Sequence, residues 1–187
     1  MLADIESILI TETQISARVT ALARSIAADL VTLPREDEIV FMPIMNGSIV
    51  FAADLMRQLP LKMRFRVAMI SSYPGTSTTS RGPHIVGSLP EDLRGCHMLL
   101  VDDILDSGQT LQLLRSEMQQ RGAVSIRACV LLRKRLATTT SEAQSCEYVG
   151  FEIPDCFVVG YGLDYDDYYR NLPHIGILKP PPFEVPA

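Results

Sequence analysis

Residues that build metal centres and disulfide frameworks are scarce in this sequence. The three histidines, His84, His97 and His174, are scattered along 187 residues, so a zinc site is not expected. The four cysteines show no C-x-x-C spacing, and we interpret them as free thiols in a reducing compartment. A functional site in this chain should therefore be built mainly from residues other than histidine and cysteine.

The chain also lacks a basic cluster, a membrane span and a signal peptide. Lys and Arg total 17 against 22 Asp and Glu, and the net charge of −5 argues against a nucleic-acid surface. The most apolar stretch, residues 39–56, is interrupted by Pro43, Asn46-Gly47 and Asp54, unlike a membrane helix. Acidic residues break up the N-terminal segment, where a signal peptide would be apolar. We expect a soluble, cytoplasmic protein whose partners include neither nucleic acid nor membrane.

What the chain does contain is an alternation of strand and helix patterns. A capping box, Thr11-x-x-Gln14, begins a helix whose apolar positions recur every three or four residues. Apolar runs predict strands at 38–44, 64–72, 97–103 and 125–132, with a short strand in 83–89 and helices at 49–59 and after residue 108. This order predicts an α/β fold with a mostly parallel central sheet flanked by helices. Residues 73–82 are rich in Gly, Pro, Ser and Thr and predict a long loop.

Polar residues gather where the predicted strands end. These ends read MNGS at 45–48, SSYPG at 71–75, VDDILDSGQT at 101–110 and LLRK at 131–134. Ligands of open α/β sheets bind outside the carboxyl ends of the strands. We therefore expect the four segments to line one crevice.

The stretch VDDILDSGQT combines acids with a turn suited to an anion. Gly108 allows the backbone to approach a ligand closely, and the first N–H groups of the following helix form an anion site. Asp102 and Asp103 suit a vicinal diol and can hold Mg²⁺ through water. A ribose 5-phosphate fits both features. The alternative is a surface turn whose solvated acids and Ser107 cap the next helix, but burying several carboxylates without a purpose is costly.

The same stretch resembles the phosphoribosyl-pyrophosphate (PRPP) motif of the type I phosphoribosyltransferases. Residues 147–178 are similar to the C-terminal half of the hypoxanthine-guanine phosphoribosyltransferases, and TETQISARV, SSYPGTS and LLRK match that family in order. The resemblance extends over about residues 8–179. It implies a single domain over 1–187, with a small hood formed by the N-terminal segment and about 147–187, and a lid at about 73–82. It also implies transfer of phosphoribose from PRPP to hypoxanthine or guanine with Mg²⁺, in a homodimer or homotetramer.

The resemblance assigns the PRPP side of the site residue by residue. Asp102 and Asp103 would hold the ribose hydroxyls and, through water, a Mg²⁺. The 5′-phosphate would lie in the turn formed by Asp106, Ser107, Gly108, Gln109 and Thr110. Pyrophosphate would be bound by Asn46, Gly47 and Arg170, with Asp164 at a second Mg²⁺.

The resemblance also assigns the purine side. Asp106 would be the general base that takes the N7 proton, and Lys134 would donate to the exocyclic O6. An ammonium has donors only, which favours 6-oxopurines over adenine. The other residues expected at the base or over it are Phe157, which would stack, Val158, through its backbone, Asp164, and the lid residues Ser72 and Tyr73. Without the resemblance, Phe157 would read as core and DYDDYYR as an exposed acidic helix turn.

Four positions depart from the common family pattern: Asn46 for a lysine, Asp102 for a glutamate, Gln109 for a lysine, and Cys156 for a charged residue. Family resemblance also predicts a cis peptide between Met45 and Asn46. Because positive charge near the phosphates is reduced, we expect weaker PRPP affinity or a heavier reliance on Mg²⁺.

Three other functions are compatible with parts of the sequence. A non-catalytic nucleotide-binding regulator would carry a basic surface, which the charge of −5 does not favour. A receiver-like signalling domain would separate its acid pair from its phosphoacceptor, whereas here all three acids share one segment. A preference for xanthine is left open, because backbone carbonyls read the purine C2 substituent.

Overall fold

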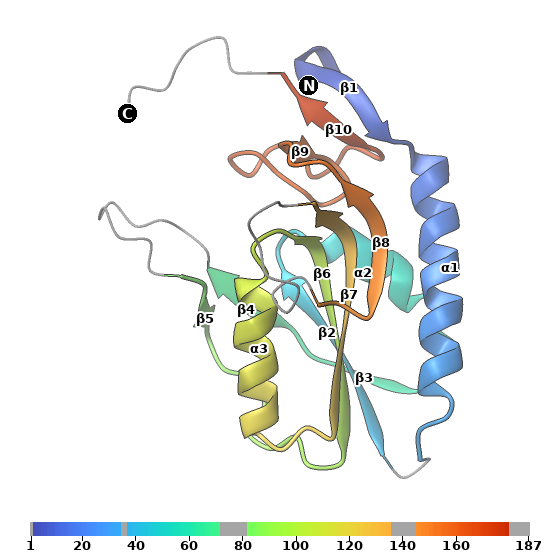
Figure 1. The fold of residues 1–187 in the computed structure, drawn as a ribbon, viewed down its shortest axis with the longest axis vertical. Coiled ribbons are helices and arrows are strands. Elements are labelled where there is room, and N and C mark those ends of the chain that lie inside the picture. Colours follow the sequence, from blue (N-terminus) through green and yellow to red (C-terminus); the bar gives the residue numbers. More distant parts are fainter. Residues whose placement is uncertain (1, 35–36, 72–81, 136–144, 180–187) are drawn as a thin grey trace.

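The computed structural model describes residues 2–34, 37–71, 82–135 and 145–179, so the lid residues Ser72 and Tyr73 lie outside the described part. The fold is a central sheet with flanking helices and a small antiparallel sheet beyond one end (Figure 1). The helices are α1 (Glu12–Leu30), α2 (Ile49–Met56) and α3 (Gln109–Gln120), after a short 3-10 turn at Leu2–Asp4. The strands are β1 (Ile5–Ile10), β2 (Glu38–Met45), β3 (Met63–Phe65), β4 (Ala68–Ser71), β5 (His84–Val86), β6 (Cys96–Leu105), β7 (Ser125–Lys134), β8 (Tyr148–Ile153), β9 (Val158–Val159) and β10 (Ile175–Leu178).

The central sheet is almost entirely parallel, as predicted. Its strands follow the order β5-β4-β2-β6-β7-β8, and β3 pairs with β2 beside this path. Every neighbouring pair is parallel except β4 with β5. In Figure 1 the carboxyl ends of β2, β6 and β7 all point towards the small antiparallel sheet. The strand ends that were predicted to line one crevice therefore lie at the same edge of the sheet.

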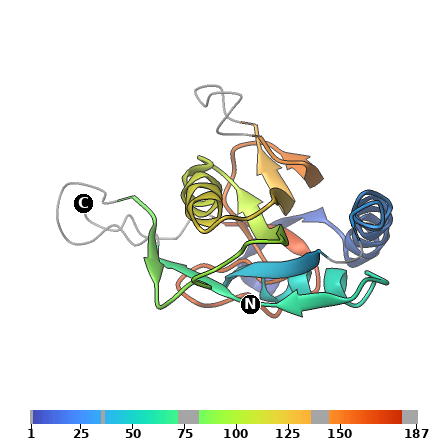
Figure 2. The same ribbon diagram turned by 90° about the horizontal axis from the view of Figure 1, so that it is seen from below.

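Helices cover both faces of the central sheet (Figure 2). Phe41, Leu99 and Val101 share a buried cluster with the apolar faces of α1 and α2. Their neighbours Met42, Met98 and Leu100 point to the other face and share a cluster with α3. Because both faces are buried, the central strands are apolar at nearly every position rather than at alternate ones.

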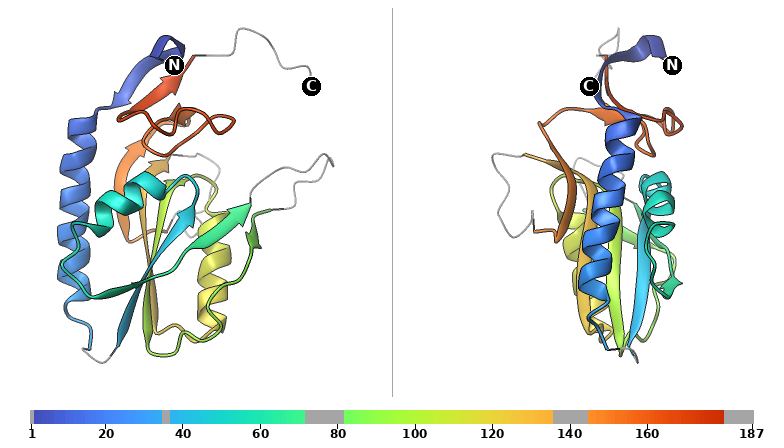
Figure 3. Two further views of the ribbon diagram at one scale, coloured as in Figure 1. Left: turned by 180° about the vertical axis from the view of Figure 1, so that it is seen from behind. Right: turned by 90° about the vertical axis from the view of Figure 1, so that its right-hand side faces the viewer.

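The hood is a three-stranded antiparallel sheet in the order β1-β10-β9. It joins the two ends of the described chain above the carboxyl ends of the central strands (Figure 3). Of the residues from 147 onward that were expected in the hood, Tyr148–Ile153 instead continues the central sheet as β8, because its apolar residues pair with β7. The predicted α/β fold, with a mostly parallel central sheet, flanking helices and a small hood, is confirmed.

Three element boundaries differ from the sequence prediction. The expected strand 64–72 is two strands, β3 and β4, which pair with different parts of β2 on either side of Pro43, a residue without an N–H. The helix expected to reach residue 59 ends at Met56, ahead of Pro60. Strand β6 continues past residue 103 to Leu105, so Asp102 and Asp103 lie inside a paired strand. In the part of the chain that the structure describes, none of the helices combines the length and apolar character needed to cross a membrane.

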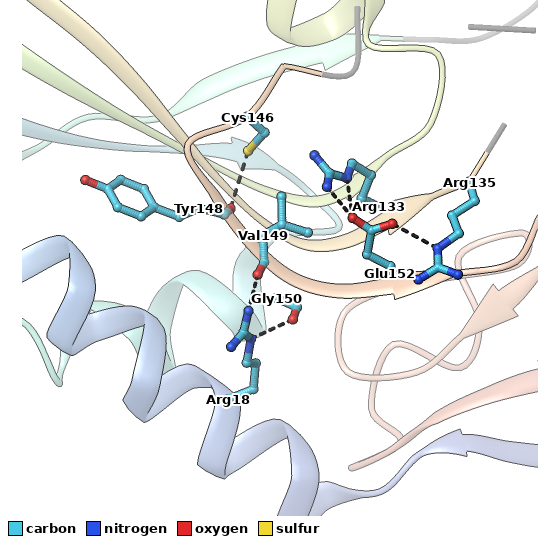
Figure 4. Close-up of polar contacts among 8 residues, drawn as sticks. All are labelled: Arg18, Arg133, Arg135, Cys146, Tyr148, Val149, Gly150 and Glu152. Carbon is cyan, nitrogen blue, oxygen red and sulfur yellow. Dashed lines mark hydrogen bonds and ion pairs between the residues drawn. The ribbon is translucent and has the colours of Figure 1, made fainter. Parts of the chain in front are cut away.

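Helix α1 is fastened at two points. At its N-terminus the predicted capping box is present: Thr11 and Gln14 exchange backbone and side-chain hydrogen bonds. Midway, the Arg18 guanidinium donates to the carbonyls of Gly150 (2.6 Å) and Val149 (2.7 Å) in β8 (Figure 4). Since β8 is the edge strand of the sheet, its outward carbonyls have no strand partner. Arg18 therefore caps the sheet edge and ties it to α1.

Replacing Arg18 by methionine keeps the apolar stem and removes both donors. We expect R18M to lower the free energy of unfolding by about 2 kcal/mol, the scale of hydrogen bonds from a charged group. Urea denaturation monitored by circular dichroism measures this. Arg24→Met is the matched control, because Arg24 is exposed on the same helix without a recorded partner among the described residues. Equal stability of R18M and R24M would contradict the role of Arg18.

Candidate active site

The loop after β2 approaches the loop after β6 so closely that only glycine fits. A Cβ on Gly47 would lie 1.9 Å from Oδ2 of Asp103. On its other side, a Cβ on Gly162 would lie 2.2 Å from the carbonyl oxygen of Gly47. The peptide between Met45 and Asn46 is cis, as predicted. We call residues 45–47 the pyrophosphate loop, after the ligand that the sequence resemblance predicts there.

The acid pair, Asp102 and Asp103, lies beneath this loop at the end of β6. Asp102 is 8% exposed, and its Oδ1 accepts a hydrogen bond of 3.0 Å from the backbone N–H of Asp103. Burial, and then the neighbouring charge of Asp103, raise the pKa of Asp102 well above its ordinary value. Burial also raises the pKa of Asp103, against the lowering effect of its hydrogen bond with Asp102. Two carboxylates held so closely favour a cation between them and the ligand.

The phosphate cradle, residues 106–110, connects β6 to α3. Gly108 stands at the N-terminus of α3 with a φ of 81°, a left-handed conformation that glycine adopts without strain. A cavity of about 420 Å³ opens over the cradle, and its lining includes Asp102, Asp103, Ser107, Gly108 and Thr110. An anion in this cavity would meet the first-turn N–H groups of α3 and the favourable end of the helix dipole. Gln109 does not line this cavity; a Cβ on Gly82 would lie 3.6 Å from its amide oxygen.

Lys134, the last residue of β7, lies between two carboxylates. Its Nζ is 3.3 Å from Oδ2 of Asp106 and 3.1 Å from Oδ1 of Asp155. Burial alone would lower the pKa of Lys134, but the hydrogen bond with Asp155 and the charge of Asp106 raise it above its ordinary value. Asp106 also lines the cavity over the cradle. The predicted base and the predicted O6 donor are therefore adjacent in space, 28 residues apart in the sequence.

A second cavity, of about 810 Å³, adjoins the first and shares Met45, Gly47, Ile70 and Asp103 with it. Phe157 lines this cavity with 53% of its surface exposed, so it is not a core residue. The ring of Tyr165 meets it edge-on, with centroids 5.6 Å apart. An exposed aromatic face in a cavity suits stacking on a planar ligand.

Arg170 connects the second cavity to the hood. Its guanidinium contacts Asp164 Oδ1 (2.8 Å) and Asp167 Oδ1 (2.9 Å), and it donates to the carbonyl of Gly162 (2.8 Å). The segment DYDDYYR is not a helix: Asp166, Asp167 and Tyr169 adopt positive φ in consecutive turns. Contacts with Arg170 stabilise these turns. The sequence pattern had indicated a helix turn here instead.

Most of the predicted site residues come together. Asn46, Gly47, Phe157, Asp164 and Arg170 line the second cavity, and the acid pair and the cradle other than Gln109 line the first. Lys134 lines neither cavity and is connected to the first through its contact with Asp106. Val158 is buried in β9 and pairs with Ile177 rather than lining either cavity. Sequence reasoning missed Asp155 and Tyr165. No sequence signal marks Asp155, because its contact with Lys134 depends on how β8 lies beside β7.

The acid pair and, at a separate position, Asp164 fit the two predicted Mg²⁺ positions, each of which ligand oxygens would complete. Among the described residues, no three His, Cys, Asp or Glu side chains converge closely enough to hold a metal alone. The second cavity is lined by four aspartates, Asp103, Asp164, Asp166 and Asp167, against the single cation Arg170 in its described lining. A polyanion could not bind beside so many carboxylates without further cations. Mg²⁺ is usually held by one or two carboxylates, waters and substrate phosphates, which agrees with this arrangement.

Comparison with known proteins identifies the same family that the sequence motifs resemble. Residues 11–166 match the model of the phosphoribosyl transferase domain. The chain is 41% identical over 180 residues to the hypoxanthine-guanine phosphoribosyltransferase of Mycobacterium avium, covering 95% of this chain and 87% of that protein. The Bacillus subtilis enzyme of that name is 37% identical over 182 residues, 97% of each chain. A Staphylococcus aureus hypoxanthine phosphoribosyltransferase structure has a TM-score of 0.84 at 33% identity, covering 96% of this chain and 95% of that one.

These matches extend over nearly the whole chain and agree with the parallel sheet, the hood and the acid-rich cleft. The chain therefore belongs to the phosphoribosyltransferase family.

Proposed function

We propose that this protein transfers the 5-phosphoribosyl group of PRPP to hypoxanthine or guanine, forming IMP or GMP and pyrophosphate. The observation that carries the proposal is the 3.3 Å contact between Asp106 and Lys134 beside the phosphate cradle. N7 and O6 lie side by side on the same edge of a 6-oxopurine. A protonated N7 needs an acceptor, and O6 needs a donor. A carboxylate next to an ammonium supplies both, and adenine, with an amino group at position 6, does not match the donor.

The proposed ligand positions follow from the two cavities. The cradle holds the 5′-phosphate, the acid pair holds the ribose hydroxyls, and the pyrophosphate loop with Arg170 faces the leaving group. Phe157, across the second cavity, stacks on the base. The relatives' names support this choice of substrates, since they are hypoxanthine and hypoxanthine-guanine phosphoribosyltransferases.

The proposed reaction is a displacement at C1′ of the ribose. The N9 lone pair forms the new bond to C1′ while the bond from C1′ to the pyrophosphate oxygen breaks, and its electron pair leaves with pyrophosphate. Asp106 accepts the proton from N7, so the purine carries no extra charge in the product. Lys134 donates to O6 throughout, and Arg170 faces the charge that develops on pyrophosphate. Bound Mg²⁺ would neutralise part of the pyrophosphate charge.

A panel of bases tests the reaction. Purified protein with PRPP and Mg²⁺ should form nucleotide from hypoxanthine or guanine and not from adenine, measured by chromatography of the products. Reactions without PRPP are the control. Absence of nucleotide from every base would refute the enzyme. Efficient use of adenine would remove Lys134 as the O6 donor, and use of xanthine alone would redirect the substrate assignment.

The role of Asp106 is tested by Asp106→Asn. An amide cannot accept the N7 proton, so turnover should fall by about 10²–10⁴-fold, the contribution of a positioned general base. PRPP binding, measured by calorimetry, should persist because the cradle uses backbone groups. Asp92→Asn is the matched control, since Asp92 pairs with Arg94 just before the amino end of β6, away from the cleft. Full activity of D106N would remove Asp106 as the base.

The reduced positive charge near the phosphates is tested by Asn46→Lys. Asn46 lines the acidic second cavity, so an added ammonium should strengthen PRPP binding. We expect the KM for PRPP to fall about twofold to fivefold, most clearly at low Mg²⁺, for an ion pair partly screened by solvent. Asn46→Gln separates the charge from the added length. An unchanged KM for PRPP in N46K would contradict the inference that this chain relies more heavily on Mg²⁺.

A further inference from the structure

Lys134 has a second carboxylate partner that the proposed reaction leaves without a role. Asp106 lies 3.3 Å from its Nζ and takes the proton in the proposed mechanism. Asp155 lies nearer, at 3.1 Å, and belongs to the turn after β8. Neither Lys134 nor Asp155 lines the two cavities, and the proposed reaction gives Asp155 no contact with the substrate.

The backbone around Asp155 is held in register with Lys134. Lys134 lies opposite Ile153 in the β7–β8 pair, and the N–H of Arg135 donates to the carbonyl of Ile153 at 2.9 Å. The N–H of Cys156 then donates to the carbonyl of Pro154 at 2.9 Å, forming a tight turn with Asp155 at its apex. The carboxylate is therefore presented to Lys134 by a fixed strand end.

The cations on either side of Lys134 are directed elsewhere. Successive side chains of a strand point to opposite faces, so Arg133 and Arg135 lie on the face away from Lys134. Both guanidiniums contact the carboxylate of Glu152 in β8 (Figure 4), Arg135 Nε at 3.0 Å and Arg133 as a close pair. Lys134 is thus the member of this basic run that faces Asp106, with Cys156 and Asp155 as the other titratable groups beside it.

We propose that Asp155 is a positioning residue for phosphoribosyl transfer: it keeps Lys134 charged and aimed at O6 while Asp106 takes the N7 proton. This inference rests on the proposed function. Before transfer, Asp106 and Asp155 both balance the ammonium. After transfer Asp106 is neutral, and Asp155 alone balances a lysine whose side chain is only 14% exposed.

The size of the effect is limited by solvent. Burial disfavours the charged form of Lys134, and Asp155 opposes this through its hydrogen bond and charge, so its loss should lower the pKa of Lys134. Asp155 itself is 64% exposed, so water screens the pair. We therefore expect a moderate change rather than loss of the enzyme.

The sequence makes a direct measurement practicable, because the chain has three lysines, Lys62, Lys134 and Lys179. In protein labelled with ¹³C-lysine, the side-chain resonances titrate individually, and Lys134→Arg identifies the signal of Lys134. In Asp155→Asn the pKa of Lys134 should fall, because the hydrogen bond and charge that raise it are lost. Lys62 and Lys179, both exposed, serve as internal controls. Glu152→Gln removes a carboxylate from the same strand end without touching Lys134 and should leave this pKa in place.

Kinetics tests the positioning role. In D155N the KM for hypoxanthine should rise about fivefold to tenfold, the scale of a weakened charge-assisted hydrogen bond, while the KM for PRPP stays constant. Asp155→Glu should recover most of the loss, and E152Q should behave as the wild type. Circular dichroism confirms that the variants are folded.

The outcomes separate the two proposals. An unchanged Lys134 pKa in D155N would overturn the inference. A lowered pKa with an unchanged KM for hypoxanthine would also overturn it, since Asp155 would then be a structural partner only. A wild-type protein that forms no nucleotide from any base would defeat the proposed function itself, and the inference with it.

Discussion

The close contact of Gly162, Gly47 and Asp103 is the constraint on which the site depends. Gly162 lies in the segment after β9, Gly47 in the loop after β2, and Asp103 near the end of β6. The contact therefore joins three parts of the fold. A Cβ at either glycine would lie within about 2 Å of its neighbour, 2.2 Å and 1.9 Å respectively. Gly162 also exchanges hydrogen bonds with Arg170, so the contact fixes the position of that guanidinium. The hood is also held over the carboxyl ends of the parallel strands by its own apolar residues, Ile10, Val158 and Ile175, which share a buried cluster with the central sheet.

The two ends of the cleft that meet at this contact differ in the groups that they offer to an anion. Over the phosphate cradle, an anion meets backbone N–H groups and the positive end of the α3 dipole, and no basic side chain is needed. Beneath the pyrophosphate loop, the acid pair is buried and the carboxylates of the hood segment lie nearby. In the proposed function, one end of the cleft would therefore bind an anion directly, and the other would bind it through cations. A ligand with a monoester at one end and a diphosphate at the other matches this division.

The sequence predicted the parts of the site whose chemistry is contiguous in the chain. VDDILDSGQT places two acids, an apolar spacer and a glycine turn within ten residues, and the structure keeps them together. Contacts set by strand register were not predictable. Asp155 meets Lys134 only because β8 pairs with β7 in parallel, with Ile153 opposite Lys134. Likewise, the turns at Asp166 and Asp167 adopt positive φ because Arg170 contacts their segment, whereas local propensity suggested a helix turn.

The proposed role of Lys134 depends on its position at the carboxyl end of β7. Its side chain is largely buried, and its ammonium contacts Asp106, which lines the cavity over the cradle. Alone there it would lose part of its charge, because burial disfavours the protonated form. One carboxylate from the loop after β6 and one from the turn after β8 balance that charge from the two neighbouring strands. The parallel order β6-β7-β8 is what brings both acids to the same ammonium, so the proposed recognition of the 6-oxo group would follow from the topology of the sheet.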